Sequence, residues 1–549
     1  MALNFADLFE HAADVFGERT AVACGDRQVT YRELEERANR LAHHLAAIGV
    51  QPGDHVGLYA RNSIEAAETL IASCKLRAAA VNINYRYVEN ELRYMFADAD
   101  LAALVHDREF APRVAAVAPP GLRGTVVIDD GSDADIGAGI AYADALAAAS
   151  PERDFPPRSN DDIYIIYTGG TTGYPKGVMW RSEDIWRTLG GGIDFVTGIP
   201  LGDEWQQSRR GLETTALVRL CAAPLIHGAA QVATLAALFG GDTVVLPPRF
   251  DAHEIWRAVE RHKVNVMLVI GDAMARPLIE AYHAGGYDAS SLVAISSSAA
   301  LFSPVVKDAC TAALPNVFIT EAIGSTETGF TGLGLVTAGA QQRGGPTVKP
   351  GPDVIVLDDQ GGRAGPGQVG RMARAGHVPL GYYKDPAKTA AMFAEVDGKR
   401  YAVPGDLARV EADGSVTLLG RGNTCVNTGG EKVFPEEVEG ALKSHPDVFD
   451  ALVIGVPDER LGQSVAALVQ PREGHTIDLA LLEAHLRGQI AGYKLPRSIW
   501  LVDFISRTVS GKADYVWARQ YAADHPPVGH PAGQPAHADH PASTGHPAA

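Results

Sequence analysis

Cysteine is scarce in this chain, and basic residues are outnumbered by acidic ones. The 549 residues include five cysteines, none in a Cys-x-x-Cys spacing, so neither a zinc site nor a disulfide framework is indicated. We expect reduced, mostly buried thiols in a cytoplasmic protein. Lys and Arg number 48 against 66 Asp and Glu, a net charge of −18, which argues against a nucleic-acid binder or a protein held on anionic membranes.

Long uninterrupted apolar runs are also missing. The segment 220–240 lacks Asp, Glu, Lys and Arg, but Pro224, His227 and Gln231 interrupt it, so we expect core elements around a site and no membrane span. The first residues show no basic segment before an apolar one and do not predict a signal peptide. With 46% apolar and 21% charged residues, the composition is that of a globular protein able to bury large cores.

Strand-like and helix-like segments alternate along most of the chain. Helical periodicity at 31–48 is followed by an apolar strand at 56–59, and a helix at 64–74 precedes a strand at 79–83, an order typical of α/β proteins with parallel sheets. After about Val354, short strands separated by Gly, Pro and Asp predict antiparallel structure. From Glu436 onward, helices and strands mix as in a compact α+β unit.

These changes of pattern predict the domain organisation. Residues 1–420 are expected to form a large α/β lobe of stacked sheets with a small β-barrel-like part, and residues 424–520 a small, mobile α+β domain. Residues 521–549 are rich in Pro, Ala, Gly and His and have almost no large apolar side chains, which predicts a disordered tail. The irregular spacing of its five histidines disfavours the alternative of a metal-binding tail.

The most informative segment is a loop rich in glycine and threonine after an apolar strand. Glycines let a backbone approach a polyanion, main-chain N–H groups and threonine hydroxyls donate to phosphate oxygens, and Lys176 neutralises charge. Pro175 and Gly177 exclude a Walker A loop, and the next helix is expected only at Ser182, as its N-cap. The alternative is a plain surface hairpin. The predicted phosphate-binding residues are Thr168, Gly169, Gly170, Thr171, Thr172, Gly173 and Lys176.

This loop resembles the phosphate-binding signature of the adenylate-forming superfamily, which contains acyl-CoA synthetases, adenylation domains of peptide synthetases and luciferases. The resemblance spans residues 5–515, with further motifs in the family's order. These motifs are Gly324–Gly329, Asp406 with Arg421, Asn427–Glu439 and Ser506–Lys512. The chain departs from the family pattern at Ile323 (usually aromatic), Pro404 (usually Thr), Asn423 (usually Asp or Lys), Ser506 (usually Pro) and Ala513 (usually a larger apolar residue).

The resemblance implies roles in ATP binding for these motifs. It places Glu327 on Mg²⁺ at the ATP phosphates, where a single carboxylate is chemically sufficient. Gly324, Ser325 and Thr326 belong to the same nucleotide-binding motif. A carboxylate can accept from two adjacent ribose hydroxyls and a guanidinium can donate to ribose or phosphate oxygens, which fits Asp406 and Arg421.

The resemblance further implies a two-step reaction. Lys512 is expected to lie between the substrate carboxylate and the α-phosphate. Thr168 is expected to lie near the same two groups. The small domain then rotates about Asn423 and brings in a loop that admits CoA. His227 is expected to line the acyl pocket, the alternative being a satisfied core histidine. The residues of the CoA loop are Gly429, Gly430 and Lys432.

The predicted activity is that of an AMP-forming acid–thiol ligase, an acyl-CoA synthetase. ATP, Mg²⁺, coenzyme A and a small hydrophobic carboxylic acid are its expected cofactors and partners, without nucleic acid or a membrane span. The oligomeric state stays open, a homo-oligomer included.

Within the superfamily, the chain is similar to actinobacterial ligases of steroid side-chain carboxylates. This similarity rests on Val81–Arg86, Gly177–Arg181, Asp272–Pro277 and Leu301–Pro304. A long-chain fatty acid is the alternative substrate, and an acyl-AMP ligase that loads a carrier protein is an alternative activity. A luciferase-like oxygenase and a non-catalytic nucleotide-binding regulator are further alternatives, the last disfavoured because Glu327, Asp406 and Lys512 are all present.

Overall fold

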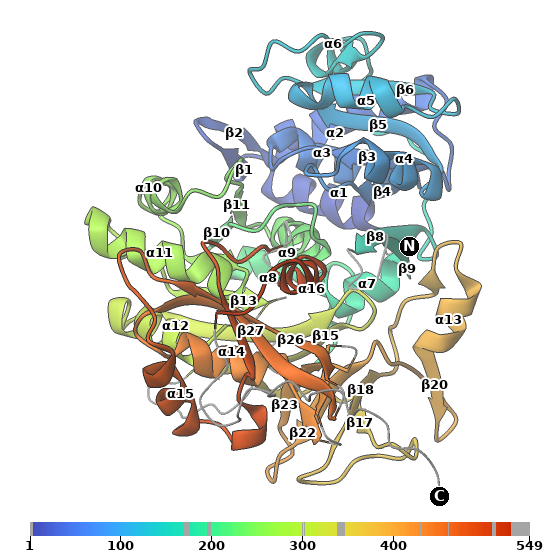
Figure 1. Cartoon of the computed structure of the whole chain (residues 1–549). Coiled ribbons are helices and arrows are strands. Elements are labelled where there is room, and N and C mark those ends of the chain that lie inside the picture. Colours follow the sequence, from blue (N-terminus) through green and yellow to red (C-terminus); the bar gives the residue numbers. More distant parts are fainter. Residues whose placement is uncertain are drawn as a thin grey trace, which may run out of the picture. The chain divides into compact units, whose positions relative to one another are not determined.

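The fold is described from a computed structural model of the whole chain (Figure 1). The structure describes every residue except 1–3, 169–174, 195–198, 299, 301, 337–345, 423, 429–430, 459, 508–511 and 529–549, and for Arg421 and Lys432 it describes the backbone alone. The chain folds into two compact units. The first comprises Met1–Thr424 and Ser506–Asp514, and the second comprises Cys425–Ile505 and Tyr515–Ala549.

The first helices begin where side chains cap them and continue where apolar residues recur. Helix α1 (Phe5–Phe16) starts after Asn4, whose Oδ1 accepts from the Ala6 N–H at 2.8 Å. Helix α2 (Tyr31–Ala47) starts with a capping box of Thr30 and Glu33. Its apolar stripe is fully buried, and burying each leucine contributes about 1.5–3 kcal/mol. The stripe consists of Leu34, Ala38, Leu41 and Leu45.

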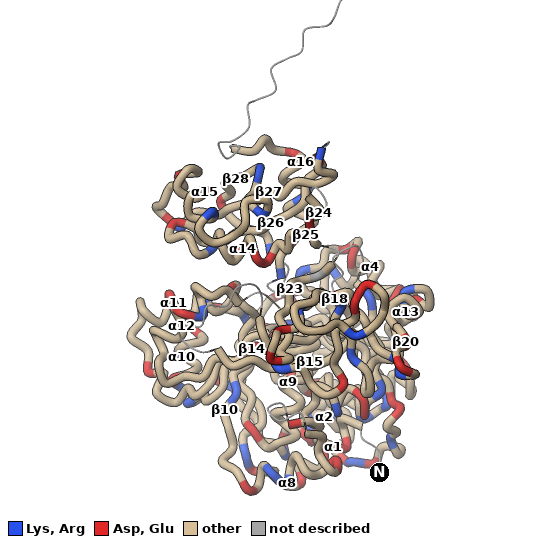
Figure 2. The backbone as a smooth tube through the Cα atoms, turned by 90° about the horizontal axis from the view of Figure 1, so that it is seen from below, with Lys and Arg blue, Asp and Glu red and all other residues tan. Residues whose placement is uncertain are grey.

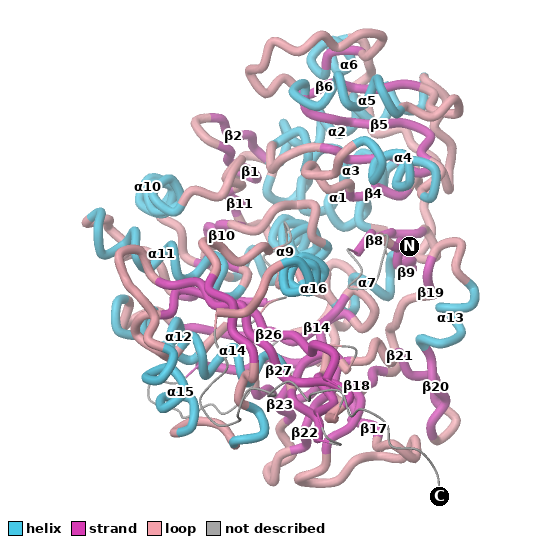
Figure 3. The backbone as a smooth tube through the Cα atoms, viewed as in Figure 1, coloured by secondary structure: helices cyan, strands magenta, loops and turns pink. Residues whose placement is uncertain are grey.

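One sheet of the first unit is entirely parallel, in the order β4-β3-β5-β6-β7. Figure 3 shows its strands next to helices, the arrangement that the alternating sequence pattern predicts. The strands are β3 (His55–Tyr59), β4 (Ala79–Asn82), β5 (Leu101–Asp107), β6 (Gly124–Ile128) and β7 (Ile140–Ala141). The helices in this part of the chain are α3 (Ile64–Lys75), α4 (Glu89–Asp98), α5 (Ala111–Val117) and α6 (Tyr142–Ala147).

A second sheet of the first unit has 15 strands among the described residues. It is parallel from β1 to β14 in the order β1-β11-β10-β12-β13-β14, with β2 antiparallel at its edge. Its strands in this part are β1 (Thr20–Cys24), β2 (Arg27–Thr30), β10 (Val218–Cys221), β11 (Thr243–Val245), β12 (Val266–Val269), β13 (Ala294–Ser298) and β14 (Phe318–Ser325). The helices between them include α7 (Ser182–Thr188), α8 (Gln206–Glu213), α9 (Gly228–Phe239), α10 (Ala252–His262), α11 (Gly271–Gly285) and α12 (Pro304–Ala313).

The same sheet continues antiparallel after β14, in the order β14-β15-β16-β23-β22-β18-β21-β20, with β17 paired to β18. Antiparallel pairing thus begins at the β14–β15 hairpin, earlier than the position near Val354 that the sequence predicted, because a tight turn joins these two strands. The strands are β15 (Gly329–Val336), β16 (Thr347–Pro350), β17 (Val354–Leu357), β18 (Val369–Arg374), β20 (Phe393–Val396), β21 (Lys399–Ala402), β22 (Asp406–Val410) and β23 (Val416–Arg421).

A short three-stranded sheet, β19-β9-β8, completes the first unit. It joins β8 (Ile163–Thr168), β9 (Lys176–Arg181) and β19 (Gly381–Tyr382), and helix α13 (Pro386–Met392) follows β19. Helix α7 begins at Ser182 itself, and the predicted N-cap role of Ser182 is wrong: its N–H donates to the Asp162 carbonyl at 2.8 Å, and Arg181 is the capping residue.

The second unit is an α+β unit around a five-stranded sheet, β25-β24-β27-β26 with β28 parallel to β27. Its strands are β24 (Val426–Thr428), β25 (Glu431–Val433), β26 (Val448–Asp458), β27 (Gly462–Pro471) and β28 (Ser498–Leu501). Its helices are α14 (Pro435–Lys443), α15 (Leu479–Arg487) and α16 (Tyr515–Asp524).

Helix α16 continues to Asp524, past residue 521 where the sequence predicted a tail. Trp517, Tyr521 and His525 contact one another at helical spacing: the rings of Trp517 and Tyr521 are tilted with centroids 5.5 Å apart, and those of Tyr521 and His525 are stacked at 4.1 Å. The Trp500 Nε1–H donates to the His525 carbonyl at 2.8 Å, and the Val528 N–H donates to Ile499. These contacts hold 521–528 on the second unit, and the rest of the predicted tail lies outside the described residues.

Charge is paired locally despite the net excess of acid. Figure 2 shows acidic and basic residues interspersed along both units. The Lys75 ammonium, fully buried, lies 2.6 Å from Glu10 and 2.8 Å from Glu35. Removing one partner of such a buried group costs about 3–5 kcal/mol. Four of the five cysteines, Cys24, Cys74, Cys221 and Cys310, are buried, which confirms the prediction of mostly buried thiols, and Cys425 is partly exposed. Within the described ranges, no helix is both long and apolar enough to cross a membrane.

Candidate active site

The predicted phosphate loop connects two paired strands. Thr168, at the end of β8, is the register partner of Lys176, at the start of β9. Of the predicted phosphate-binding residues, the glycines and threonines at 169–173 lie outside the described residues. The Lys176 ammonium forms an ion pair with Asp385, which raises the pKa of Lys176. The two described ends of the loop are therefore held by a strand pair and an ion pair.

A buried asparagine joins the phosphate loop to the segment of His227. Asn82 donates to the carbonyls of Tyr167 (2.9 Å) and Ile226 (2.6 Å), and its Oδ1 accepts from the Tyr167 N–H at 2.8 Å. It thereby contacts the residue before Thr168 and the residue before His227.

Helix α9, whose N-cap is His227, packs directly on β8. A Cβ on Gly228 would lie 2.7 Å from Ile166, so only glycine permits this approach. The Tyr164 hydroxyl also donates to Gln231 at 2.7 Å. Thr168 and His227, far apart in sequence, are therefore brought to neighbouring positions at the end of β8.

The second predicted nucleotide motif is the tight turn between β14 and β15. Ser325 Oγ accepts from the Thr328 N–H at 3.1 Å, and the Trp180 Nε1–H donates to the Thr326 carbonyl at 3.0 Å. Gly329 has a φ of +67° with Thr188 against it, so a side chain there would be both strained and obstructed. Trp180 lies on β9, so one strand contacts both predicted nucleotide motifs.

Glu327 lies in this turn and is 7% exposed. Its Oε1 accepts a hydrogen bond from the Tyr382 hydroxyl at 3.0 Å. One carboxylate held in this way fits Mg²⁺, which commonly takes one or two carboxylates and completes its shell with substrate phosphates and water. Ile323, at the position where the family usually has an aromatic residue, is 5% exposed and packs in an apolar core cluster with Val348 and Val354.

The described residues contain one group of three carboxylates close enough to share an ion: Asp107, Glu109 and Asp130. Burial raises the pKa of Asp107 to about 7. Its Oδ2 accepts from the Arg61 N–H at 2.8 Å, and the Arg61 guanidinium donates to Glu109 at 2.7 Å. We therefore regard the group as part of an arginine network. It does not include Glu327.

The two residues predicted to bind ribose are directly opposite each other. Asp406, at the start of β22, is the register partner of Arg421, at the end of β23. Gly405 has a φ of +96°, and its carbonyl accepts from the Gly422 N–H at 3.0 Å. These backbone contacts hold the start of β22 and the end of β23 together, so Asp406 and Arg421 lie on adjacent strands although they are 15 positions apart in sequence.

The remaining predicted residues lie at the C-terminal motifs. Lys512 is exposed, and its segment, Ser506–Asp514, groups with the first unit. Arg507 and Ala513 of this segment form an antiparallel β-bridge. Gly429 and Gly430 lie outside the described residues, between β24 and β25 of the second unit. Lys432 is on β25, opposite Asn427.

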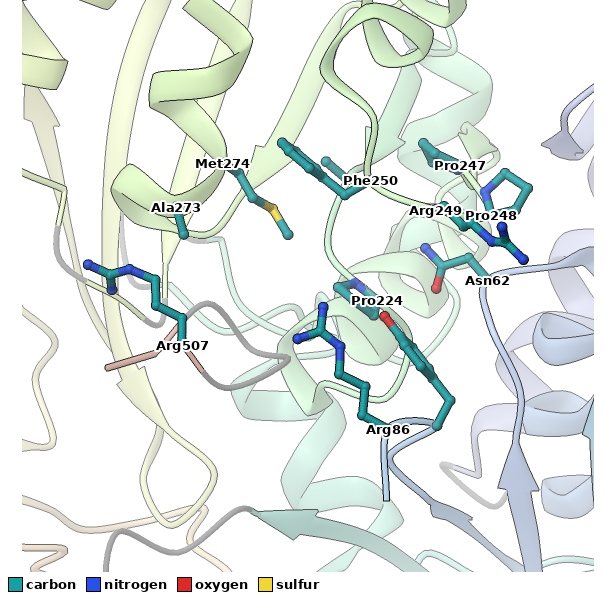
Figure 4. A pocket seen from close by; sticks show the side chains of 12 residues that line it. Asn62, Arg86, Pro224, Pro247, Pro248, Arg249, Phe250, Ala273, Met274 and Arg507 are labelled. Carbon is teal, nitrogen blue, oxygen red and sulfur yellow. The ribbon is translucent and has the colours of Figure 1, made fainter. Parts of the chain in front are cut away.

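A pocket of about 240 Å³ opens in the first unit (Figure 4). In this view Arg249 and Arg507 lie on opposite sides of the hollow, with Arg86 between them. Tyr85 and Phe250 add aromatic surface. The arginines come from three separate segments, and they make the pocket suited to an anionic ligand. The rest of the lining consists of Asn62, Ala222, Pro224, Pro247, Pro248, Ala273 and Met274.

The sequence model of AMP-binding enzymes matches residues 9–383, and that of the AMP-binding enzyme C-terminal domain matches residues 437–512. The chain belongs to the AMP-binding enzyme family. This confirms the resemblance to adenylate-forming enzymes.

Relatives of this AMP-binding enzyme are CoA ligases. It is 56% identical over 538 residues to a 3-oxocholest-4-en-26-oate–CoA ligase of Rhodococcus rhodochrous, covering 96% of this chain and 97% of the relative. It is 53% identical over 533 residues to a medium/long-chain-fatty-acid–CoA/3-oxocholest-4-en-26-oate–CoA ligase of Mycobacterium tuberculosis, covering 96% and 97%. The predicted class, an AMP-forming acid–thiol ligase, is confirmed.

Solved structures of other enzymes share the fold. An anthranilate CoA ligase in complex with anthranoyl-AMP superimposes with a TM-score of 0.81 at 23% identity, covering 95% of this chain and 97% of the other. ATP-bound MatB from Rhodopseudomonas palustris gives a TM-score of 0.78 at 27% identity, covering 95% and 99%. The predicted fold class, a large α/β lobe followed by a small C-terminal domain, is confirmed.

Sequence reasoning missed several residues that contact the predicted site of this AMP-binding enzyme. Asn82, Trp180, Tyr382 and Asp385 each contact a predicted residue or its neighbour from another part of the chain. Asn82 lies inside Val81–Arg86 and Trp180 inside Gly177–Arg181, segments whose sequence indicates a substrate class but not these contacts. Nothing local in the sequence distinguishes Tyr382 or Asp385 from ordinary residues of a strand end and a helix start.

Proposed function

We propose that this enzyme joins a steroid side-chain carboxylate to CoA through an acyl-adenylate. The observation that carries the proposal is the 56% identity, over nearly the full length of both chains, to the Rhodococcus ligase of 3-oxocholest-4-en-26-oate. Medium- and long-chain fatty acids are second substrates, because the Mycobacterium tuberculosis relative is named for both classes. A cytoplasmic location and a homo-oligomer stay predictions.

In the first step, a carboxylate oxygen forms a bond to the α-phosphorus of ATP, and the bond to pyrophosphate breaks. Two anions must approach each other, so the site needs positive charge and hydrogen-bond donors directed at the charge that develops. Lys512 carries that charge at the α-phosphate, and Lys176 with the loop after Thr168 holds the other phosphates. Asp406 and Arg421 hold the ribose.

Mg²⁺ would be held by Glu327. When bound, the ion neutralises charge on the phosphate oxygens. The turn between β14 and β15 keeps the Glu327 carboxylate at the nucleotide.

In the second step, the CoA thiol attacks the acyl carbon, and AMP leaves with the oxygen that came from the carboxylate. The second unit supplies the loop that contains Gly429, Gly430 and Lys432, and a rotation near Asn423 exchanges this loop for Lys512. The phosphates of CoA need cations outside the ATP site. The pocket lined by Arg86, Arg249 and Arg507 offers them.

Removing one pocket arginine is expected to weaken CoA binding without affecting adenylation. Arg86→Gln and Arg249→Gln should each raise the KM for CoA about five- to tenfold. Each substitution removes a hydrogen bond between charged groups, and such a bond contributes about 1.5 kcal/mol or slightly less to the free energy of CoA binding. Steady-state kinetics with varied CoA measure this change. Arg93→Gln, at an exposed pair with Glu89, is the matched control. An unchanged KM for CoA in both variants would contradict the assignment.

The substrate proposal is tested by ATP–pyrophosphate exchange over a series of acids, followed by analysis of the products formed with CoA. The steroid acid should give the highest kcat/KM, fatty acids a lower one, and aromatic acids the lowest. A preference for a fatty acid would overturn the steroid assignment. Product release that needs a carrier protein in place of CoA would favour the carrier-loading alternative.

A further inference from the structure

One short segment, Gly381–Asp385, contacts both residues that are proposed to handle the charge of the ATP phosphates. Strand β19 pairs with β9, with Tyr382 opposite Val178, and the Tyr383 N–H donates to the Gly177 carbonyl at 2.7 Å. This register places the end of β19 beside the start of β9, where Lys176 lies. The chain then turns directly into α13.

Tyr382 reaches the proposed Mg²⁺ ligand. Its hydroxyl donates to Glu327 Oε1 at 3.0 Å, and the Glu327 side chain is 7% exposed. A carboxylate that has lost most of its water needs donors, and such a donor also selects one orientation of the group. Tyr382 itself is held by its backbone, since its N–H donates to Thr389 Oγ1 at 2.9 Å.

Asp385 reaches the lysine of the phosphate loop. Its Oδ2 accepts from the Lys176 ammonium, while its Oδ1 accepts from the Lys388 N–H at 3.0 Å as the N-cap of α13. The hydrogen bond from the first turn of α13 therefore fixes the position of the Asp385 carboxylate. A lysine side chain has four rotatable bonds, so a fixed partner restricts where its charge lies.

We propose that Tyr382 and Asp385 are positioning residues, which hold Glu327 and Lys176 in the geometry that binds Mg²⁺ and the ATP phosphates. The proposal rests on the roles given to Glu327 and Lys176 in the proposed function. It adds that one segment, from β19 to the N-cap of α13, aligns both groups, so that disturbing it changes nucleotide binding and Mg²⁺ dependence without removing any group that touches substrate.

Tyr382→Phe tests the contact with Glu327. Binding of a non-hydrolysable ATP analogue, measured by calorimetry at varied Mg²⁺ and without acid or CoA, should need about tenfold more Mg²⁺ for half-maximal affinity. The control is Tyr383→Phe, which removes a neighbouring hydroxyl that donates to Asp100 at 2.8 Å. If Tyr382→Phe and Tyr383→Phe have the same Mg²⁺ dependence as the original enzyme, the role of Tyr382 is overturned.

Asp385→Asn tests the contact with Lys176. Asparagine keeps an N-cap oxygen for α13 and removes the charge. The ATP analogue should bind roughly fivefold more weakly at saturating Mg²⁺. In the background of Lys176→Met, Asp385→Asn should have no further effect, because the residue acts through Lys176. Tighter or unchanged binding in Asp385→Asn, or full additivity of the two changes, would overturn the role of Asp385.

These outcomes are separate from the fate of the proposed function. The ATP analogue binds without a carboxylic acid, so its affinity can be measured even if the enzyme activates neither steroid nor fatty acids. Such a failure to activate acids would refute the proposed function, while the binding measurements would still test the roles of Tyr382 and Asp385. A melting temperature within a few degrees of the original enzyme's for each variant shows that an altered affinity is not due to unfolding.

Discussion

Lys512→Ala is expected to lower carboxylate-dependent ATP–pyrophosphate exchange by about 10²–10³-fold, because it removes the charge that faces the α-phosphate as the new bond forms. The same variant should convert supplied acyl-AMP and CoA to thioester at a rate close to that of the original enzyme. The two steps are measured separately, the first by exchange of labelled pyrophosphate and the second by release of AMP.

Loss of adenylation alone, with thioester formation retained, distinguishes a specific role of Lys512 from a general loss of activity. In the proposed mechanism Lys512 is needed only while the adenylate forms, since the rotation removes it before the thiol attacks. Arg487→Ala, which removes an exposed cation paired with Glu483 on α15, should leave both steps unchanged. An equal loss in both steps of Lys512→Ala would contradict the assigned role.

Glu327→Gln should reduce adenylation by about 10²–10³-fold at the Mg²⁺ concentration that saturates the original enzyme. Glutamine has nearly the same shape and can still accept from Tyr382, so the loss reports on the negative charge. Initial rates at increasing Mg²⁺ measure it, together with ATP-analogue binding. Glu395→Gln, at an exposed position on β20, is the control. Full Mg²⁺-dependent activity in Glu327→Gln would remove this residue from the metal site.

The parts of the fold that could be predicted from sequence are those with local signals. The stripe of α2 and the alternation of helices and strands give the parallel sheets, because both patterns lie within a few tens of residues. The start of antiparallel pairing was placed too late, since a single turn at 325–328 decides it. Helix α16 runs past residue 521, where the sequence predicted a tail, because its aromatic residues contact one another and Trp500 anchors His525.

In the candidate site, too, the parts with local sequence signals could be predicted and the long-range contacts could not. The strands on either side of the proposed phosphate loop could be predicted, because each is an apolar run next to the glycines, threonines and lysine; the role of the loop itself stays a prediction. Asp406 and Arg421 could be paired only through the family resemblance, and the structure places them on adjacent strands. Asn82, Tyr382 and Asp385 contact groups 85, 55 and 209 residues away. Contacts at such separations depend on the packing of whole sheets, which no short pattern specifies.

The acidic net charge of the chain bears on large binding partners but not on small polyanionic substrates. It argued against nucleic acid and anionic membranes as partners, yet the proposed reaction binds two polyanions, ATP and CoA. We propose that their charge is met by single cations at defined places, Lys176 and Lys512 at ATP and the three arginines that line the pocket at CoA. Net charge therefore informs about large partners, whereas binding of a small polyanion depends on a few local cations and backbone N–H groups.

Transfer of oxygen from the acid to AMP distinguishes an acyl-adenylate from other activated forms of the acid. The steroid acid is prepared with ¹⁸O in its carboxylate and incubated with the enzyme, Mg²⁺, ATP and CoA, and the products are analysed by mass spectrometry. If the carboxylate attacks the α-phosphorus and the thiol then breaks the acyl–oxygen bond, one ¹⁸O appears in AMP and none in pyrophosphate. Formation of ADP with ¹⁸O in inorganic phosphate, or of AMP without label, would contradict the acyl-adenylate mechanism.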